Sequence, residues 1–235
     1  MRAVILAGGK GTRLRPYTTI LPKPLVPVGE RPILEIIIRQ LVRRGFDEID
    51  LCVGHMGELI KAYFDQATGI PEGVELRYLW EKTPLGTAGA LHLIEEPDQN
   101  FLVMNGDILS TLDYRALMRH HREQDAALTI ASHRKDVPLA LGVIEGDNGV
   151  VTDYIEKPTL KYEVSMGVYV YSPRALEHIP KGPFDFPDVV LALIEAGEKV
   201  CTYHFDGTWF DIGTPAEHER ALTTFAEDPG LFDVV

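Results

Sequence analysis

A short glycine-rich segment near the amino terminus carries residue types that bind phosphate. Gly8-Gly9-Lys10-Gly11-Thr12-Arg13 directly follows the apolar run Arg2–Leu6. Glycines let backbone N–H groups approach a ligand closely, and the nearby basic side chains neutralise phosphate oxygens. The segment is neither a Walker A loop, which needs a closing Gly-Lys-Ser/Thr, nor a dinucleotide fingerprint, because Leu14 stands where the third glycine should be. Taken alone, the segment also fits an ordinary strand-to-helix turn. The residues that accompany it elsewhere in the sequence favour a polyphosphate-binding loop.

One lysine and two carboxylates stand where they would complement this loop. Lys23 lies between two prolines, which present its side chain on a stiff segment. Asp107 follows an apolar run ending at Met104, and Asp211 precedes a glycine and a helix-start signal. Each aspartate alone is more typical of a turn or a helix cap. Beside a polyphosphate loop, the two together indicate oxygen ligands for a magnesium ion next to phosphate.

The strands and helices that would position these residues are indicated by an alternation of strand and helix patterns along the sequence. The strand patterns cover residues 2–6, 48–53, 74–80, 101–104, 127–131, 142–145, 150–155, 168–171 and 200–204, and the helix patterns cover 32–45, 58–66, 87–94, 114–123, 187–196 and 215–225. The first half predicts an α/β fold with a mainly parallel sheet, helices on both faces and ligands at the carboxyl ends of its strands. The closely spaced strands after Asp107 predict a mixed, partly antiparallel half. With no repeat or linker, one domain over residues 1–235 is expected.

Composition and charge exclude several classes of protein. The chain has 235 residues, of which 45% are hydrophobic and 25% charged, as in ordinary globular proteins. No apolar run approaches the ~18 residues that span a bilayer, and no signal-peptide pattern opens the chain, so a cytoplasmic protein without a membrane partner is expected. A formal net charge of -12 argues against a nucleic-acid partner. Residues 1–31 nevertheless carry six basic side chains against one acid, which supports a local anion site.

Four separated blocks resemble the sugar-1-phosphate nucleotidylyltransferases, also called nucleotide-sugar pyrophosphorylases. The blocks are Leu6-Ala7-Gly8-Gly9-x-Gly11-Thr12-Arg13-Leu14-x-Pro16 with Pro22-Lys23-Pro24; Pro84-Leu85-Gly86-Thr87-Ala88-Gly89; Gly106-Asp107; and Glu156-Lys157-Pro158 with Trp209-x-Asp211-Ile212-Gly213-Thr214. The resemblance implies the Rossmann-like nucleotide-diphospho-sugar transferase fold. It also implies attack by a sugar 1-phosphate on the α-phosphorus of a nucleoside triphosphate, with release of pyrophosphate. Because the sequence ends soon after the last helix pattern, the left-handed β-helix domain that many relatives append is not expected.

The resemblance assigns roles to residues of this sequence. Arg13, Lys23 and Asp107 would be catalytic, and Asp107 and Asp211 would hold Mg²⁺. The residues that would contact the nucleotide are Leu6, Ala7, Gly8, Gly9, Gly11, Thr12, Arg13, Glu81, Pro84, Gly86 and Thr87. Those that would contact the sugar phosphate are Gly142, Glu156, Lys157 and Ser165; Ser165-Met166-Gly167 replaces the Asn-Ala-Gly of many relatives, which alters the sugar contact.

Glu81 stands where relatives that use uridine or thymidine triphosphate commonly carry glutamine. A carboxylate only accepts hydrogen bonds, and guanine presents two donor groups on its Watson–Crick edge, so Glu81 favours GTP. The short chain resembles guanylyltransferases for mannose 1-phosphate or heptose 1-phosphate, and a homo-oligomer is compatible with it. A cytidylyl-, uridylyl- or thymidylyltransferase on another phosphate stays open, as does a non-catalytic subunit that senses nucleotide sugars.

Overall fold

A seven-stranded sheet forms the centre of the computed structural model, which describes residues 1–66, 73–95, 97 and 99–232. The strands are β1 (Arg2–Leu6), β4 (Glu48–Val53), β5 (Glu75–Trp80), β6 (Phe101–Asn105), β8 (Leu128–Pro138), β11 (Thr159–Tyr171) and β12 (Val200–His204). Their spatial order is β12-β8-β11-β6-β1-β4-β5. The strands β6, β1, β4 and β5 run parallel, whereas β11 is antiparallel to both of its neighbours. The expected α/β class with a mainly parallel, mixed sheet is confirmed.

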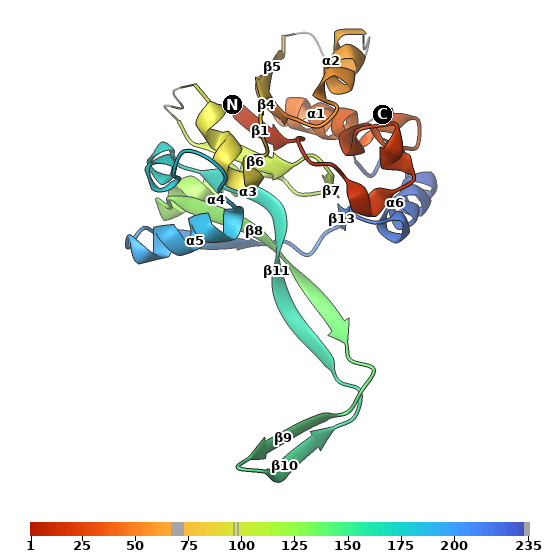
Figure 1. Cartoon of the computed structure of the whole chain (residues 1–235), viewed down its shortest axis with the longest axis vertical. Helices are drawn as coiled ribbons and strands as arrows, with labels where there is room; N and C mark the ends of the chain where they lie inside the picture. Colours follow the sequence, from red (N-terminus) through yellow and green to blue (C-terminus); the bar gives the residue numbers. More distant parts are fainter. Residues whose placement is uncertain (67–72, 96, 98, 233–235) are drawn as a thin grey trace.

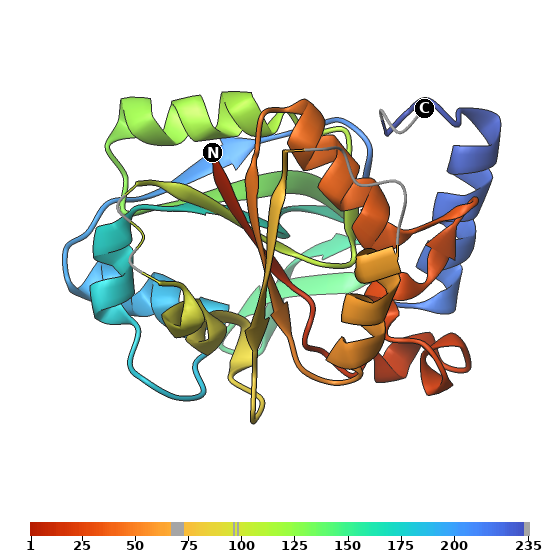
Figure 2. The same cartoon turned by 90° about the horizontal axis from the view of Figure 1, so that it is seen from above.

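Helices cover both faces of this sheet, as Figure 2 shows for α1 and α4 on one side and α3 and α5 on the other. The helices are α1 (Ile33–Arg43), α2 (Gly57–Gln66), α3 (Gly86–Gly89), α4 (Tyr114–Gln124), α5 (Phe186–Glu195) and α6 (Pro215–Glu227). Successive side chains of β1 point to opposite faces, so Ile5 joins the core cluster that contains α1 residues and Val4 the cluster that contains α5 residues. No helix within the described ranges is both long and apolar enough to cross a membrane.

Four short strands escape the sequence patterns because each is only two or three residues long. They are β2 (Pro27–Val28), β3 (Arg31–Pro32), β7 (Ile108–Ser110) and β13 (Trp209–Asp211). The pair β7–β13 is antiparallel and sets Asp211 opposite Ile108. Since Asp107 directly precedes Ile108, this small ladder brings two aspartates that are about a hundred positions apart in the sequence to one place.

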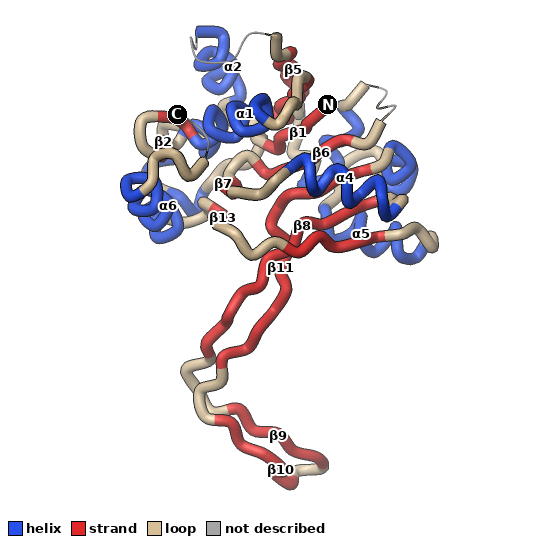
Figure 3. The backbone as a smooth tube through the Cα atoms, turned by 180° about the vertical axis from the view of Figure 1, so that it is seen from behind, coloured by secondary structure: helices blue, strands red, loops and turns tan. Residues whose placement is uncertain are grey.

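The strands β8 and β11 are much longer than their apolar patterns predict. Beyond the body of the molecule they continue as a paired ribbon, at whose end β9 (Val143–Asp147) and β10 (Val150–Ile155) form a separate two-stranded sheet (Figures 1 and 3). The outer parts of β8 and β11 alternate polar residues with a few apolar ones and are mostly exposed, so they lack the buried pattern that predicts the inner parts. We call residues 136–163 the arm.

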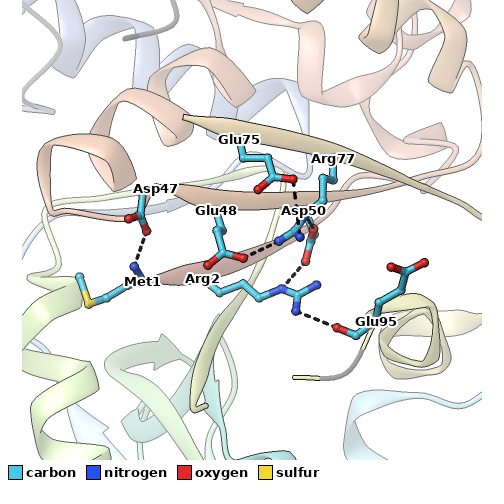
Figure 4. A network of polar contacts seen from close by, with 8 residues as sticks. All are labelled: Met1, Arg2, Asp47, Glu48, Asp50, Glu75, Arg77 and Glu95. Carbon is cyan, nitrogen blue, oxygen red and sulfur yellow. Dashed lines mark hydrogen bonds and ion pairs between the residues drawn. The ribbon is translucent and has the colours of Figure 1, made fainter. Parts of the chain in front are cut away.

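An ion-pair network around one buried aspartate holds the parallel strands β1, β4 and β5 in register. Asp50 on β4 is fully buried, and its two carboxylate oxygens accept hydrogen bonds from Arg2 Nε of β1 at 2.7 Å and Arg77 Nε of β5 at 2.9 Å (Figure 4). Arg77 also binds Glu48 at 2.7 Å. A buried carboxylate left unpaired is costly, so a one-residue slip of either neighbouring strand would be penalised.

Another buried polar cluster gives the fold a predicted acid sensitivity. His121 on α4 is fully buried, with Nδ1 2.8 Å from Thr129 Oγ1 and Nε2 3.1 Å from Ser172 Oγ. Burial, and then the nearby positive charge of Arg174, lowers the pKa of His121 to about 4. The unfolded chain therefore binds the extra proton at higher pH than the folded chain does, because its histidine titrates near 6.5.

We expect the free energy of unfolding to fall as the pH drops from about 6.5 to about 4, and His121→Gln to lose less stability over this range. Urea denaturation of both proteins at pH 7 and pH 4.5 measures the difference, and His55→Gln at an exposed position controls for the loss of a histidine. An acid loss of equal size in wild type and His121→Gln would contradict the assignment.

Candidate active site

A cavity of about 450 Å³ opens at the carboxyl ends of β1, β5 and β6. We call it the first cavity. The described residues that line it are Leu6, Ala7, Gly8, Gly9, Lys10, Gly11, Thr12, Arg13, Lys23, Pro24, Glu81, Pro84, Gly86, Thr87, Asn105, Gly106, Asp107 and Gly213. The glycine-rich loop thus forms one wall, and segments that are far apart in the sequence form the others.

Backbone hydrogen bonds between successive strand ends draw these segments together. The Gly106 N–H donates to the Leu6 carbonyl at 2.9 Å, and the Ala7 N–H donates to the Cys52 backbone carbonyl at 2.8 Å. Gly11 has a φ of +59°, and a Cβ there would stand 2.9 Å from the Lys23 Cβ, so only glycine fits this turn easily. The loop shape therefore depends on both its glycine and the Lys23 segment packed against it.

Opposite charges meet at the inner end of the first cavity. Lys23 forms an ion pair with Asp107, and their side chains are only 12% and 19% exposed. Burial and the nearby Asp107 carboxylate raise the pKa of Asp211 above its ordinary value. Lys23 and Arg13 act in the opposite direction. The Arg13 guanidinium also approaches the backbone at Gly213, where a Cβ would stand 3.4 Å from its nitrogen.

Glu81, directly after β5, forms part of the opposite wall. Its Oε2 accepts a hydrogen bond from the Leu85 N–H at 3.0 Å. Its Oε1 lies against the glycine loop, 2.4 Å from where a Cβ on Gly8 would stand. The carboxylate is therefore held between two backbone segments and faces the cavity, with one oxygen already engaged.

The segment after Glu81 is held by a loop from the other half of the chain. The Thr87 N–H donates to Asp185 Oδ1 at 3.0 Å, and the Phe186 N–H donates to Thr87 Oγ1 at 2.8 Å. A Cβ on Gly89 would stand 2.2 Å from the Gly182 carbonyl oxygen. The small residues of this block therefore let two backbones pack closely, which fixes Thr87 at the rim of the cavity.

A second cavity of about 390 Å³ adjoins the first and shares Thr87 and Asn105 with it. We call it the second cavity. Its described lining residues are Thr87, Asn105, Ile108, Lys135, Val164, Ser165, Met166, Gly167, Tyr169, Phe186, Pro187, Trp209 and Asp211. The rings of Tyr169 and Phe186 stack with centroids 3.9 Å apart, and Trp209 Nε1 donates to the Met166 carbonyl at 3.1 Å. Aromatic faces and polar groups therefore line a space next to the two aspartates.

The structure brings most of the sequence-predicted residues together. All those expected at the nucleotide line the first cavity, with Lys23 and Asp107. Ser165 and Asp211 line the second cavity. By contrast, Gly142, Glu156 and Lys157 lie on the arm and line neither cavity, so the structure of one chain does not bring them to the other predicted residues, and their contact with the sugar phosphate stays a prediction.

The reason for this separation is the length of the β8–β11 pairing. The two strands stay in register from Ser132 opposite Ser165 out to Pro138 opposite Thr159. Thr159 is six residues from Ser165, about 20 Å of extended strand. Lys157 lies beyond that point, where its Nζ is 3.7 Å from Glu156 Oε1 and both side chains are more than half exposed.

Sequence reasoning missed several residues of the second cavity. Lys135, Tyr169 and Phe186 carry no motif, and their strand or helix positions read as structural. Asn105, which lines both cavities, adjoins the Gly106-Asp107 motif but has no predicted role of its own. The one available signal was the stretch Trp209–Asp211, whose tryptophan stands two positions before the predicted magnesium ligand Asp211.

Comparison with known proteins places the whole fold in one family. Residues 2–227 of the 235 match the family described as Nucleotidyl transferase. The chain belongs to this family. Within it, the chain is 35% identical over 246 residues to a UTP–glucose-1-phosphate uridylyltransferase from Synechocystis sp., covering 94% of this chain and 62% of that protein. The resemblance to sugar-1-phosphate nucleotidylyltransferases is thereby confirmed.

Two other members of the family carry different names. A mannose-1-phosphate guanylyltransferase catalytic subunit beta from Danio rerio is 32% identical over 97% of this chain and 65% of its own length. The crystal structure of a putative glucose-1-phosphate thymidylyltransferase from Bacillus anthracis is similar with a TM-score of 0.77 at 26% identity, over 99% of both chains. The chain spans slightly less than two thirds of the length of the curated relatives it matches. The family is shared, and the nucleotides in these names differ.

The close approach of Gly8 to Glu81 predicts that a side chain at position 8 destabilises the protein. Gly8→Ala should push the Glu81 carboxylate away and break its bond to Leu85, since the added Cβ would stand 2.4 Å from Oε1. The free energy of unfolding should fall by about 1 kcal/mol, the usual net value of one such hydrogen bond. The matched control is Gly9→Ala, because nothing stands within 4 Å of that Cβ. Urea denaturation compares them, and equal effects would contradict the contact.

Proposed function

We propose that this chain is a catalytic domain that joins a nucleoside triphosphate, GTP, to a sugar 1-phosphate of the mannose or heptose type and releases pyrophosphate. The observation that carries the proposal is the pair of adjoining cavities. One has a glycine loop with Lys10, Arg13 and Lys23, and the other has aromatic walls, with Asp107 and Asp211 near their junction. Membership of the family supports a nucleotidyl transfer, and the names of the two curated relatives given above state that they act on sugar 1-phosphates.

The reaction forms one bond and breaks one bond at phosphorus. An oxygen of the sugar 1-phosphate attacks the α-phosphorus, and the bond to the bridging oxygen breaks, so that pyrophosphate leaves with the electron pair. Little covalent chemistry is left to the protein, and catalysis rests on positioning and charge neutralisation. In the first cavity, backbone N–H groups from Gly8 to Thr12 would hold the phosphates, while Arg13 and Lys23 would offset the charge that develops on them.

The site fits a divalent magnesium ion. No group of three or more His, Cys, Asp or Glu side chains that could hold a metal occurs in the described part of the chain. Mg²⁺, however, commonly takes one or two carboxylates and completes its shell with water and substrate phosphates. Asp107 and Asp211 supply such a pair. Burial first, and the neighbouring Asp107 carboxylate second, raise the pKa of Asp211, and a bound cation would stabilise its charged form. When bound, the ion would supply positive charge to the transferred phosphate.

Glu81 supports guanine as the base. Its carboxylate faces the first cavity beside the Gly8 backbone, and a carboxylate presents only acceptors. Guanine offers the N1–H and N2–H₂ donors, whereas uracil and thymine offer one donor between two carbonyl oxygens that a carboxylate repels. The names of the relatives include uridylyl, guanylyl and thymidylyl transfer, so this part of the proposal rests on Glu81.

A pyrophosphate-release assay across the four nucleoside triphosphates, with mannose, heptose and glucose 1-phosphates, tests the proposed function. Release is expected to be fastest with GTP and mannose or heptose 1-phosphate. Fastest release with UTP and glucose 1-phosphate would favour the activity named in the Synechocystis relative. Release with none of the pairs would contradict the transferase proposal and favour a subunit that only binds nucleotide sugars.

The paired aspartates predict that turnover requires magnesium. Asp107→Asn and Asp211→Asn should each lower kcat/KM by about a hundredfold or more, because each removes a charged ligand that matters most in the transition state. Asp206→Asn is the matched control, since that carboxylate is 72% exposed and pairs with His204. Circular dichroism checks folding. A near-wild-type rate of either site variant in saturating magnesium would show that its ligand role is wrong.

The position of Glu81 predicts base choice. GTP should be preferred over UTP by at least about tenfold in kcat/KM, because a charged acceptor without its donor costs more than about 1 kcal/mol. Glu81→Gln should narrow this preference, since an amide can turn either a donor or an acceptor to the base. Competition between mixed triphosphates measures the ratio. An unchanged ratio in the variant would contradict base reading by Glu81 and leave the transferase proposal intact.

A further inference from the structure

The arm is a long excursion that this chain's own body does not cover. It leaves the sheet as the ribbon of β8 and β11 and ends in the hairpin β9–β10, well away from the helices (Figures 1 and 3). Ten of the eleven residues in β9 and β10 are exposed. An isolated two-stranded hairpin is marginally stable in water and normally needs a third strand or a packed helix. In the described part of the chain, the sheet of β9 and β10 has only these two strands.

The exposed surface of the arm is unusually apolar. Seven of the sixteen large hydrophobic side chains that are exposed in the described chain belong to it: Leu141, Ile144, Val150, Val151, Tyr154, Ile155 and Tyr162. Leu141 is 77% and Val150 67% exposed. Such a concentration on a short projecting segment is typical of a surface that is buried against a partner.

The arm also carries polar residues that have no role where they lie. Tyr154 donates to Glu156 Oε2 at 3.0 Å, and Glu156 pairs with Lys157 on the surface. A Cβ on Gly142 would stand 2.0 Å from the Tyr154 hydroxyl, so the glycine lets this cluster close. The three residues that the family resemblance assigns to the sugar phosphate are thus gathered into one compact group at the junction of ribbon and hairpin.

The second cavity lacks what this group would supply. Among its described lining residues Lys135 is the sole cation, and none comes from the arm. A sugar 1-phosphate brings two negative charges to a place already next to Asp107 and Asp211. The cavity therefore needs a further positive charge that its own body does not present.

The geometry of the ribbon keeps Glu156 and Lys157 away from the second cavity of the same chain. Ser165 lies at the root of the ribbon and lines the second cavity, whereas Lys157 lies beyond the last pair, Pro138 opposite Thr159. Seven consecutive pairs separate the two ends. The tip can reach its own cavity only by breaking these pairs, while a second copy can accept it with all of them intact.

We propose that two copies of this chain exchange arms, so that Gly142, Glu156 and Lys157 of one copy complete the second cavity of the other. The roles of these residues rest on the proposed function. Each copy has one arm and one open cavity, so a two-fold axis satisfies both at once. The arm has 28 residues, comparable with the roughly 20–30 residues per side of a standard protein interface.

Mixing two inactive variants tests the exchange directly. Arg13→Ala damages the body and Lys157→Ala damages the arm, and each should lower turnover by about a hundredfold. When the two are denatured and refolded together, a mixed pair contains one intact body served by one intact arm. About half of the pairs would be mixed, each with one sound site, so activity should return to about a quarter of wild type.

The matched control mixes Arg13→Ala with Lys23→Ala. Both residues belong to the body, so no mixed pair contains a sound site and no activity should return. Absence of recovery in the first mixture, with mixed pairs shown by native mass spectrometry, would overturn the exchange. If wild type itself releases no pyrophosphate, the proposed function fails, and the arm exchange is then judged by the association measurement below.

Analytical ultracentrifugation supplies that measurement without any need for activity. Wild type should sediment as a dimer, and the double variant Ile144→Asp and Val151→Asp on the hairpin as a monomer. Ile194→Asp on α5, where the side chain is 58% exposed, should remain a dimer. A monomeric wild type, or a dimer that survives the hairpin substitutions, would overturn the proposal.

Discussion

The hydrogen bonding between adjacent parallel strand ends is the constraint on which the site depends. Once β1 is paired on both sides, the Ala7 N–H is tied to Cys52 and the Gly106 N–H to Leu6, so three loops must leave the sheet at one edge. Parallel strands end at the same edge, which makes this edge a common origin for the glycine loop, Glu81 and Asp107. The buried Asp50 network keeps β1, β4 and β5 in the register that this arrangement requires.

Charge at this edge is arranged around partly buried groups. Lys23 and Asp107 are mostly shielded from water and face each other, and Asp211 joins them through the short β7–β13 ladder. In such surroundings electrostatic interactions are stronger than in bulk water, so small changes in the charge of a bound group alter the balance strongly. This matches the demand of a reaction in which negative charge shifts between phosphate groups.

The arm shows the opposite condition, because most of its residues are exposed and, apart from Glu163 at its root, which pairs with His204, its described contacts lie mainly within the ribbon and the hairpin. The pairing of β8 with β11 holds the ribbon together, and nearly all residues of the hairpin strands at its end are exposed. The same chain thus has a body with an open second cavity and an arm with exposed apolar side chains, and the one could bind the other. The proposed exchange of arms between two copies would cover the apolar hairpin and complete the second cavity.

The amino-acid sequence by itself determined the local elements and the residues of the first cavity, because strand and helix periodicity and the glycine–charge pattern are local properties. The run Glu48–Val53 and the run Val200–His204 form strands with the bounds that were predicted. Only the tertiary structure decided three further features: the meeting of Asp211 with Asp107, the aromatic walls of Tyr169 and Phe186, and the outward course of the arm. Each depends on pairing or packing between segments far apart in the chain. In the outer parts of β8 and β11, too few apolar residues alternate with polar ones to predict a strand that continues beyond the core.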